Sequence, residues 1–356
     1  MKPIRDRKRD NNLLLATWNI RDFDSNKYEW GPRLEETFYY LAEMISAFDF
    51  VAIQEVNRDL EPLRKLVGIL GREWDYLVTD VTEGWSGNDE RMAYVFNTEK
   101  VWFRKIAGEI VLPRWKKKKD TDEDKGKEKV KDKGWFDDKI EVKRQFARSP
   151  YLVAFQSGWF KFSLCTVHIY FGEDSGPKLK RRVEEIKRLM EFFAERQDDE
   201  NKQTKDRLGN VENYILLGDF NVVSPEHETM EALKSEGFEV PSDIDGRKVR
   251  DDDPGEQDHF YDQIAVRVKD PRFRVGDGGM VDMFDDVFRM EEREIYAAKV
   301  PKEDPEKNPK YKVKTPEAIY RKWRSWQMSD HKPLWIEIKT DYSEHYLREL
   351  VEENSS

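Results

Sequence analysis

Cysteine is nearly absent from this sequence. Cys165 is its single cysteine, so no disulfide can form within the chain. This excludes the small secreted folds that several disulfides hold together, and it permits a reducing compartment. Cys165 lies in an apolar run over residues 160–169, where a free cysteine behaves as a small buried hydrophobic side chain.

Long apolar runs are also missing. No run approaches the roughly 18 residues that a membrane-spanning helix needs, and residues 1–12 are charged, without the apolar stretch of an export signal. We therefore expect no stable membrane insertion and a cytoplasmic location. We also expect a monomer, and the sequence identifies no protein partner.

An excess of basic charge is absent as well. The chain has 63 Lys and Arg against 73 Asp and Glu, a formal net charge of −10. This disfavours a protein that binds nucleic acid through a broad basic surface, because such affinity comes mostly from neutralising phosphates. An enzyme with a locally cationic site stays open, since a bound divalent metal reverses the local field.

The residues that are present indicate a folded α/β protein with polar loops. Of 356 residues, 38% are hydrophobic, enough for a large core, and 38% are charged. Helical spacing of apolar residues predicts two amphipathic helices, through Leu34, Phe38, Leu41 and Ile45 and through Val183, Ile186, Met190 and Phe193. Short apolar runs predict strands at 13–18, 50–54, 92–96, 151–155, 160–168, 214–218, 260–268 and 334–338.

These elements alternate along the whole chain without a Pro-, Gly- or Ser-rich linker. We therefore expect one catalytic domain over residues 1–356. Two charged segments, at about 113–145 and 301–315, are predicted as insertions between core elements. The first begins with Trp115 and four lysines; it is either a basic arm for nucleic acid or a solvated loop, and its mixed charges favour the loop.

Carboxylate, amide and imidazole side chains stand at the ends of five strand-like segments. They are Asn19, Glu55, His168, Asp219 with Asn221, and Asp330 with His331. Each has an ordinary explanation when taken singly, such as a core histidine, a helix cap or a turn. Strand ends of an open α/β arrangement converge on one crevice, however, which is the usual place for a ligand.

These residue types suit metal-assisted phosphoryl chemistry. Mg²⁺ takes oxygen ligands, usually with only one or two protein carboxylates, and Glu55 with the amide oxygen of Asn19 fits that pattern. Asp219 can orient a water or hydroxyl, and Asn221, on the same face of an extended segment, can bind a phosphate oxygen. An imidazole beside a carboxylate is held in one tautomer, ready to move a proton.

Four ordered motifs carry a resemblance to a known family. Trp18-Asn-Ile-Arg21, Gln54-Glu-Val56, Gly218-Asp-Phe-Asn221 and Ser329-Asp-His331 resemble the motif set of the endonuclease/exonuclease/phosphatase superfamily, with deoxyribonuclease I as a familiar relative. The resemblance implies an α/β fold, a four-layer sandwich of two packed mixed β-sheets flanked by helices. It also implies metal-dependent hydrolysis of phosphodiester bonds, by a DNA or RNA endo- or exonuclease that uses Mg²⁺ or alternatively Mn²⁺.

Three further segments extend the resemblance to deoxyribonuclease I. Residues 89–96 resemble the segment whose glutamate braces a catalytic histidine, which implies Glu90 beside His168. Residues 261–264 resemble the segment whose aspartate braces the other histidine, which implies Asp262 beside His331. Residues 146–150 resemble the segment that supplies a phosphate-binding arginine, here Arg148.

The family mechanism implies a role for each of these positions. His331 would deprotonate the attacking water and His168 would protonate the departing oxygen. The implied metal ligands are Glu55 and Asn19, with Asp330 as a further ligand or an electrostatic helper. Asn221 and Arg148 would stabilise charge on the phosphoryl oxygens, and Asp219 would orient the reacting groups.

Two departures from the relative concern the substrate. Its groove-reading arginine after Gln-Glu-Val is Asn57 here, and its sugar-stacking tyrosine aligns with Asn88. These departures argue against duplex DNA. Together with the low basic charge they favour an alternative, a phosphoesterase acting on a phospholipid, sphingomyelin or a small phosphate ester. A catalytically silent binding module is a further alternative, less favoured because every core position of the motifs is filled.

Overall fold

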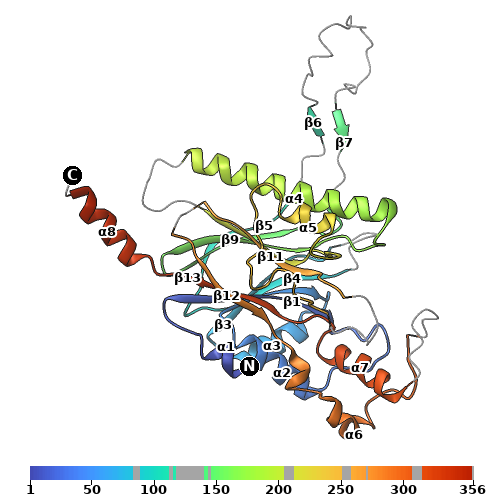
Figure 1. Ribbon diagram of the computed structural model, residues 1–356. Coiled ribbons are helices and arrows are strands. Elements are labelled where there is room, and N and C mark those ends of the chain that lie inside the picture. The colour runs from blue at the N-terminus through green and yellow to red at the C-terminus, as the bar shows by residue number, and fades with distance from the viewer. Residues whose placement is uncertain are drawn as a thin grey trace, which may run out of the picture.

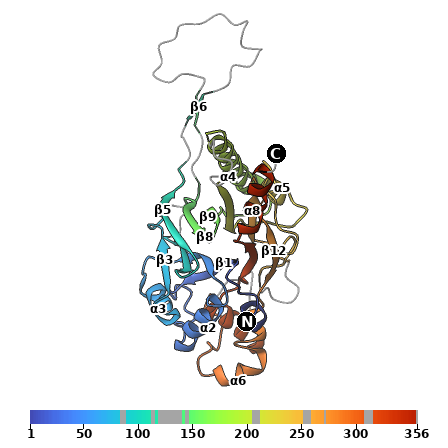
Figure 2. The same cartoon turned by 90° about the vertical axis from the view of Figure 1, so that its left-hand side faces the viewer.

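The fold is a stack of helices, two β-sheets and helices. The computed structural model describes residues 1–82, 89–111, 115–117, 140–142, 146–203, 212–250, 258–269, 272–306 and 315–354. Within these residues two mixed sheets pack face to face, and helices cover the outer face of each (Figure 1). The view turned by 90° shows the same order of layers (Figure 2). The predicted four-layer sandwich is confirmed.

The first sheet contains the first and the last strand of the chain, β1 and β13. Its strand order is β12-β13-β1-β2-β4-β3, with β1 parallel to β2 and antiparallel to β13. The strands are β1 (Asn12–Phe23), β2 (Phe50–Val56), β3 (Trp74–Val78), β4 (Arg91–Asn97), β12 (Val275–Met280) and β13 (Leu334–Lys339).

The second sheet comes from the middle of the chain. Its order is β11-β10-β9-β8-β5, with β9 and β10 parallel and β10 and β11 antiparallel. The strands are β5 (Trp102–Glu109), β8 (Tyr151–Ser157), β9 (Phe160–His168), β10 (Asn213–Asp219) and β11 (Asp262–Arg267). A separate pair, β6 (Trp115–Lys117) with β7 (Ile140–Val142), lies outside the sandwich in Figure 1.

Helices cover both sheets on the outside. In Figure 1, α4 and α5 lie over the second sheet, while α2, α3 and α7 lie below the first. The longer helices are α2 (Glu35–Ile45), α3 (Glu61–Leu70), α4 (Gly176–Gln203), α7 (Pro316–Gln327) and α8 (Ser343–Asn354). The shorter ones are α1 (Lys2–Arg5), α5 (Glu228–Leu233), α6 (Arg293–Tyr296) and the 3₁₀ turns η2 (Met283–Asp285) and η3 (Met290–Glu292).

Strand alternation divides the core into two. On β1, Leu13 and Leu15 pack in the cluster between the sheets, whereas Leu14 and Ala16 pack against the helices of the first sheet. Both faces are buried, which explains why this strand reads as a continuous apolar run. Tyr94 joins the sheets, since its hydroxyl donates to the Tyr151 carbonyl at 2.7 Å and accepts from the Thr166 N–H at 2.7 Å, both in the second sheet.

The sequence-based strands and helices are found, with shifted ends. Strand β9 spans 160–168 as predicted, and the stripe through Leu34 forms α2, for which Leu34 is the residue before the first turn. The sequence does not predict β3, β5, β12 or the short strands β6 and β7. On β5 most side chains are exposed, including Trp102, so the strand lacks the apolar pattern that identifies a buried one.

The strand directions bring the predicted polar residues to one edge. β1, β2, β9 and β10 end with or near Asn19, Glu55, His168 and Asp219, while β11 begins at Asp262. The two parallel pairs therefore deliver their carboxyl ends to the same side of the sandwich. His331 arrives at this edge just before β13 begins, because β13 runs antiparallel to β1.

The two predicted insertions are only partly within the described residues. Most of 113–145 lies outside them, as do 307–314 of the second insertion and Asn88. Glu306, at the described end of the second insertion, lines the pocket discussed below. Among the described residues, no helix combines the length and apolar character needed to cross a membrane.

Candidate active site

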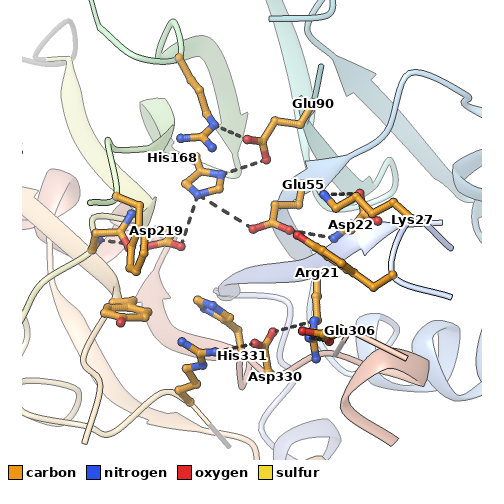
Figure 3. Close-up of a pocket in the computed structure, with 16 residues that line it drawn as sticks. Arg21, Asp22, Lys27, Glu55, Glu90, His168, Asp219, Glu306, Asp330 and His331 are labelled. Atoms are coloured by element: carbon orange, nitrogen blue, oxygen red, sulfur yellow. Dashed lines mark hydrogen bonds and ion pairs between the residues drawn. The ribbon is translucent and has the colours of Figure 1, made fainter. Parts of the chain in front are cut away.

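A polar pocket of about 460 Å³ opens where the strand ends converge (Figure 3). Its walls come from both sheets and from the loops that follow β1 and β9. The lining residues are Arg21, Asp22, Lys27, Tyr28, Glu55, Glu90, Arg148, His168, Phe171, Asp219, Asn221, Arg250, Tyr261, Glu306, Asp330 and His331. Of the predicted site residues only Asn19 and Asp262 lie outside this lining, and both are fully buried.

His168 forms the first imidazole–carboxylate pair. Its Nδ1 lies 3.1 Å from Glu90 Oε2, although 78 residues separate the two in sequence. Its Nε2 is 3.6 Å from Asp219 Oδ2 and 4.0 Å from Glu55 Oε1. Burial and Arg148 oppose a charged imidazole, but Glu90 and Asp219 outweigh them and raise the pKa of His168.

Glu90 is itself held by two cationic groups. Burial alone would raise its pKa, but His168 and Arg148 lower the pKa of Glu90 to about 2. Arg148 is buried and donates from Nε to Glu90 Oε1. The predicted phosphate-binding arginine therefore lines the pocket while it also anchors the carboxylate that orients His168.

His331 forms the second pair, with a shorter contact. Its Nδ1 lies 2.5 Å from Asp262 Oδ2. Burial would lower the pKa of His331, but the charge and hydrogen bond of Asp262 raise it to about 10. The main chain at His331 is fixed as well, since its carbonyl accepts from Trp18 Nε1 at 2.9 Å and its N–H donates to Ser329 Oγ at 2.9 Å.

Asp219 and Asn221 lie on a strained turn after β10. The N–H of Asn221 donates to Asp219 Oδ1 at 2.9 Å, and Asn221 Nδ2 donates to the Ile169 carbonyl at 2.8 Å. Asn221 has a positive φ of 52°, a conformation tolerated best by glycine and asparagine. Gly218 precedes them with φ 133°, and a Cβ there would lie 2.2 Å from the Val167 carbonyl oxygen.

Glu55 stands on a break in the strand ladder. It has φ 60°, and the register between β2 and β4 shifts between Ile53 and Val56. Such irregularities redirect a side chain out of the sheet. Glu55 Oε2 accepts from the Asp22 N–H at 2.8 Å, and its side chain stays 24% exposed toward the pocket.

Asn19 presents its nitrogen, rather than its oxygen, to the carboxylates. Its Nδ2 donates to Glu55 Oε1 at 2.9 Å and to Asp219 Oδ2 at 3.3 Å. Its Oδ1 accepts from the Arg21 N–H at 2.9 Å. In this arrangement Asn19 orients Glu55 and Asp219 from beneath, whereas the sequence suggested that its oxygen would bind metal.

Asp330 is enclosed by two arginines. Arg250 Nη2 lies 3.1 Å from Asp330 Oδ2, and Arg21 Nε lies 3.8 Å from Oδ1. Burial opposes ionisation, yet these cations hold the pKa of Asp330 well below its usual range. Asp330 therefore reaches the pocket with its charge already balanced, which makes it a weaker candidate for a metal ligand than Glu55.

Three pocket residues bring potential metal-ligand atoms close together. Glu55, Glu90 and His168 each offer one atom, and these atoms lie within 4.8 Å of one another. Carboxylates suit Mg²⁺ or Mn²⁺, whereas an imidazole suits softer metals. The sequence assigned Glu55 to the metal but Glu90 and His168 only to each other, so the structure brings the two predicted groups together.

Several pocket residues were not identified from the sequence. Lys27, Phe171, Arg250 and Glu306 belong to loops whose local sequence carries no recognisable pattern. Arg21 could have been identified from the sequence, since it is the last residue of the first motif. Arg250 pairs across a short bridge with His331, a contact that only the folded chain creates.

The sequence matches no family model and no curated protein. The fold does match solved structures over nearly all of the chain. An endonuclease/exonuclease/phosphatase family protein from Bacteroides thetaiotaomicron has 19% identity and a TM-score of 0.51, covering 93% of this chain and 95% of that one.

Two other matches carry more specific names. The mannosyl-6-phosphatase of B. thetaiotaomicron VPI-5482 has 20% identity and a TM-score of 0.50, covering 92% of this chain and 99% of that one. D. rerio TDP2, in complex with a single strand DNA product, has 12% identity and a TM-score of 0.51, with coverage of 92% and 99%. At such identities the likeness concerns the fold. The chain therefore has the deoxyribonuclease I-like fold of the endonuclease/exonuclease/phosphatase superfamily.

Proposed function

We propose that this protein hydrolyses phosphodiester bonds of nucleic acid with the help of a divalent cation, Mg²⁺ or Mn²⁺. The observation that carries the proposal is the pair of buried imidazole–carboxylate contacts, Glu90 with His168 and Asp262 with His331, which face one pocket. Two proton-moving groups in one pocket suit a displacement in which the attacking water loses a proton and the leaving oxygen gains one.

The two imidazoles divide the proton transfers. With Nδ1 engaged by Asp262, the Nε2 of His331 is the nitrogen that accepts a proton from the attacking water. His168, whose Nδ1 is engaged by Glu90, gives a proton from Nε2 to the departing oxygen. A carboxylate on each Nδ1 keeps a proton there, so that neutral His331 accepts a proton at Nε2 and protonated His168 gives one from Nε2.

The phosphoryl group is held by the remaining residues. Glu55 would bind the cation, with Asn19 orienting that carboxylate and Asp330 adding charge nearby. The cation supplies positive charge to the phosphoryl oxygens. Asn221 and Arg148, which line the pocket, would donate hydrogen bonds to those oxygens.

His331 must lose its proton before it can act as a base. Its pKa of about 10 means that imidazolium predominates at neutral pH, because Asp262, Asp330 and Asp219 together outweigh the opposing effect of burial. Positive charge brought into the pocket disfavours imidazolium. The proposal therefore predicts that cation binding and the basic form of His331 favour each other.

The test is hydrolysis of plasmid DNA, single-stranded DNA and single-stranded RNA with Mg²⁺, with Mn²⁺ and with chelator. We expect cation-dependent cleavage that falls by about 10²–10⁴-fold in His331→Gln, the usual contribution of one proton transfer. Asp219→Asn should fall as well. The absence of cation-dependent cleavage of any of the three nucleic acids would refute the proposal.

A small phosphate ester is the second candidate substrate. One fold neighbour is named a mannosyl-6-phosphatase, and six carboxylates line the pocket beside four Arg and Lys. The negative net charge also favours a small ligand over a polyanion. Faster turnover of a sugar phosphate or phospholipid than of every nucleic acid would favour this candidate.

A further inference from the structure

Phe171 places an exposed aromatic ring at a pocket that is otherwise strongly polar. It is 51% exposed and lies three residues after His168. Its ring meets the edge of Tyr261 with centroids 6.1 Å apart and planes at 80°. Tyr261 in turn stands 5.9 Å from the His331 ring, so the aromatic surface begins beside the proposed base.

The loop that carries Phe171 is braced by a buried arginine. Arg182 of α4 is fully buried and donates to the Gly172 carbonyl at 2.9 Å and to the Asn221 carbonyl at 3.1 Å. It also pairs with Asp174 at 2.9 Å, and its guanidinium lies 5.6 Å from the Phe171 ring centroid. One guanidinium thus fixes the Phe171 loop relative to the phosphate-binding candidate Asn221.

A second exposed ring reaches the pocket from the other sheet. Tyr28, in the loop after β1, is 42% exposed and lines the pocket. It rests edge-on against the buried Trp326, with centroids 5.7 Å apart, and the Lys27 ammonium lies 5.1 Å from its ring. Both aromatic side chains are therefore supported from behind and open toward the pocket.

We propose that Phe171 is the stacking platform for an unpaired base next to the cleaved phosphate, with Tyr28 of the loop after β1 contacting the same strand. This deepens the proposed function and rests on it. The substrate would be single-stranded nucleic acid or a frayed end, because a base inside a duplex is already stacked and cannot reach a side chain in a pocket.

The chemistry of the ring favours a base over a sugar. Phe171 has no polar atom, so it offers only a flat apolar face, which suits the π-face of any base and carries little sequence preference. Sugar hydroxyls need donors and acceptors, which a phenyl ring lacks. The braced loop removes most of the ordering cost that a mobile aromatic side chain would meet on binding.

The experiment compares oligothymidylate with a strand of equal length in which every nucleotide lacks its base. Cleavage is measured with Mn²⁺, and binding is measured by fluorescence anisotropy in chelator. For Phe171→Ala we expect kcat/KM and affinity to fall by about 10-fold on oligothymidylate, within the usual range for one stacked base. On the abasic strand, Phe171→Ala should change kcat/KM and affinity little. Phe171→Trp, which keeps an aromatic ring, should leave both quantities near their wild-type values on oligothymidylate.

Tyr39→Ala is the matched control, since Tyr39 is an exposed ring on α2 outside the pocket. Equal losses of Phe171→Ala on both strands, or none on either, would overturn the stacking role. A loss confined to mannose 6-phosphate turnover would overturn it in favour of a sugar. If binding depends on Phe171 and the base but wild type cleaves neither strand, the proposed hydrolysis fails while the stacking platform stands.

Discussion

Glu185 offers a direct test of the electrostatics beside the pocket. This residue of α4 is almost completely buried, and its Oε1 accepts from the N–H of Ala147 at 3.1 Å. Burial raises the pKa of Glu185 from 4.5 to about 7, against the opposing hydrogen bonds from Ala147 and Tyr170 and the charge of Arg181. Because Ala147 precedes Arg148, the same contact positions the arginine that anchors Glu90.

The sign and size of the effect on stability follow from this shift. The pKa of this carboxyl is higher in the folded than in the unfolded protein. Its contribution to stability is therefore fully present at pH values below the unfolded pKa, and it is lost as the pH rises through the folded pKa. The interval from 4.5 to about 7 covers about 2.5 pH units. At about 1.36 kcal/mol per unit, ionisation of Glu185 costs about 3 kcal/mol of unfolding free energy above pH 7.

The assay is urea unfolding of wild type and Glu185→Gln at intervals between about pH 5 and pH 7. Glutamine keeps an oxygen for the Ala147 N–H but cannot ionise. We expect the two proteins to converge near pH 5 and the wild type to become less stable than the variant by about 3 kcal/mol near pH 7. Glu90, with a lowered pKa, changes the stability mainly below this pH interval, and His331, with a raised pKa, changes it mainly above the interval. Parallel stability curves would refute the reasoning.

Three other predictions concern the site. Asp262→Asn removes the charge that holds the pKa of His331 at about 10, so in pH–rate profiles the rise of activity should move to lower pH while the plateau falls by about 10²–10⁴-fold. Gly218→Ala places a Cβ 2.2 Å from the Val167 carbonyl oxygen, so urea unfolding should show a loss of about 1–3 kcal/mol together with a loss of activity. In wild type, Mg²⁺ at about 100 times its Kd should add about 2.7 kcal/mol of stability, and Glu55→Gln should lose most of this gain in thermal unfolding.

Each of these has an outcome that contradicts it. If the rise of activity with pH is not shifted in Asp262→Asn, a group other than His331 controls that rise. Unchanged unfolding of Gly218→Ala would mean that the β9–β10 contact can open without cost. A full Mg²⁺ effect in Glu55→Gln would place the cation elsewhere, and Glu43→Gln, an exposed carboxylate on α2, is the control for a general charge effect.

The local sequence was sufficient for much of the fold. Buried strands such as β1 and β9 are short apolar runs, and α2 and α4 show helical spacing, because burial requires apolar side chains at the period of each element. The order of the polar motifs carried the resemblance and with it the sandwich, and the segments 89–96 and 261–264 added the pairs Glu90–His168 and Asp262–His331. Strands with exposed faces, such as β5, could not be predicted, because their side chains do not show the apolar pattern of a buried strand.

Only the tertiary structure decided how the pocket residues act on one another. Asn19 turns its nitrogen to Glu55, and Asp330 is enclosed by Arg21 and Arg250. Phe171 faces the same pocket because Arg182 holds its loop against Asn221. These contacts join segments that are distant along the chain. Local periodicity encodes which face of an element is buried, whereas the direction of each side chain and the charge beside it arise only when the strands have been brought together.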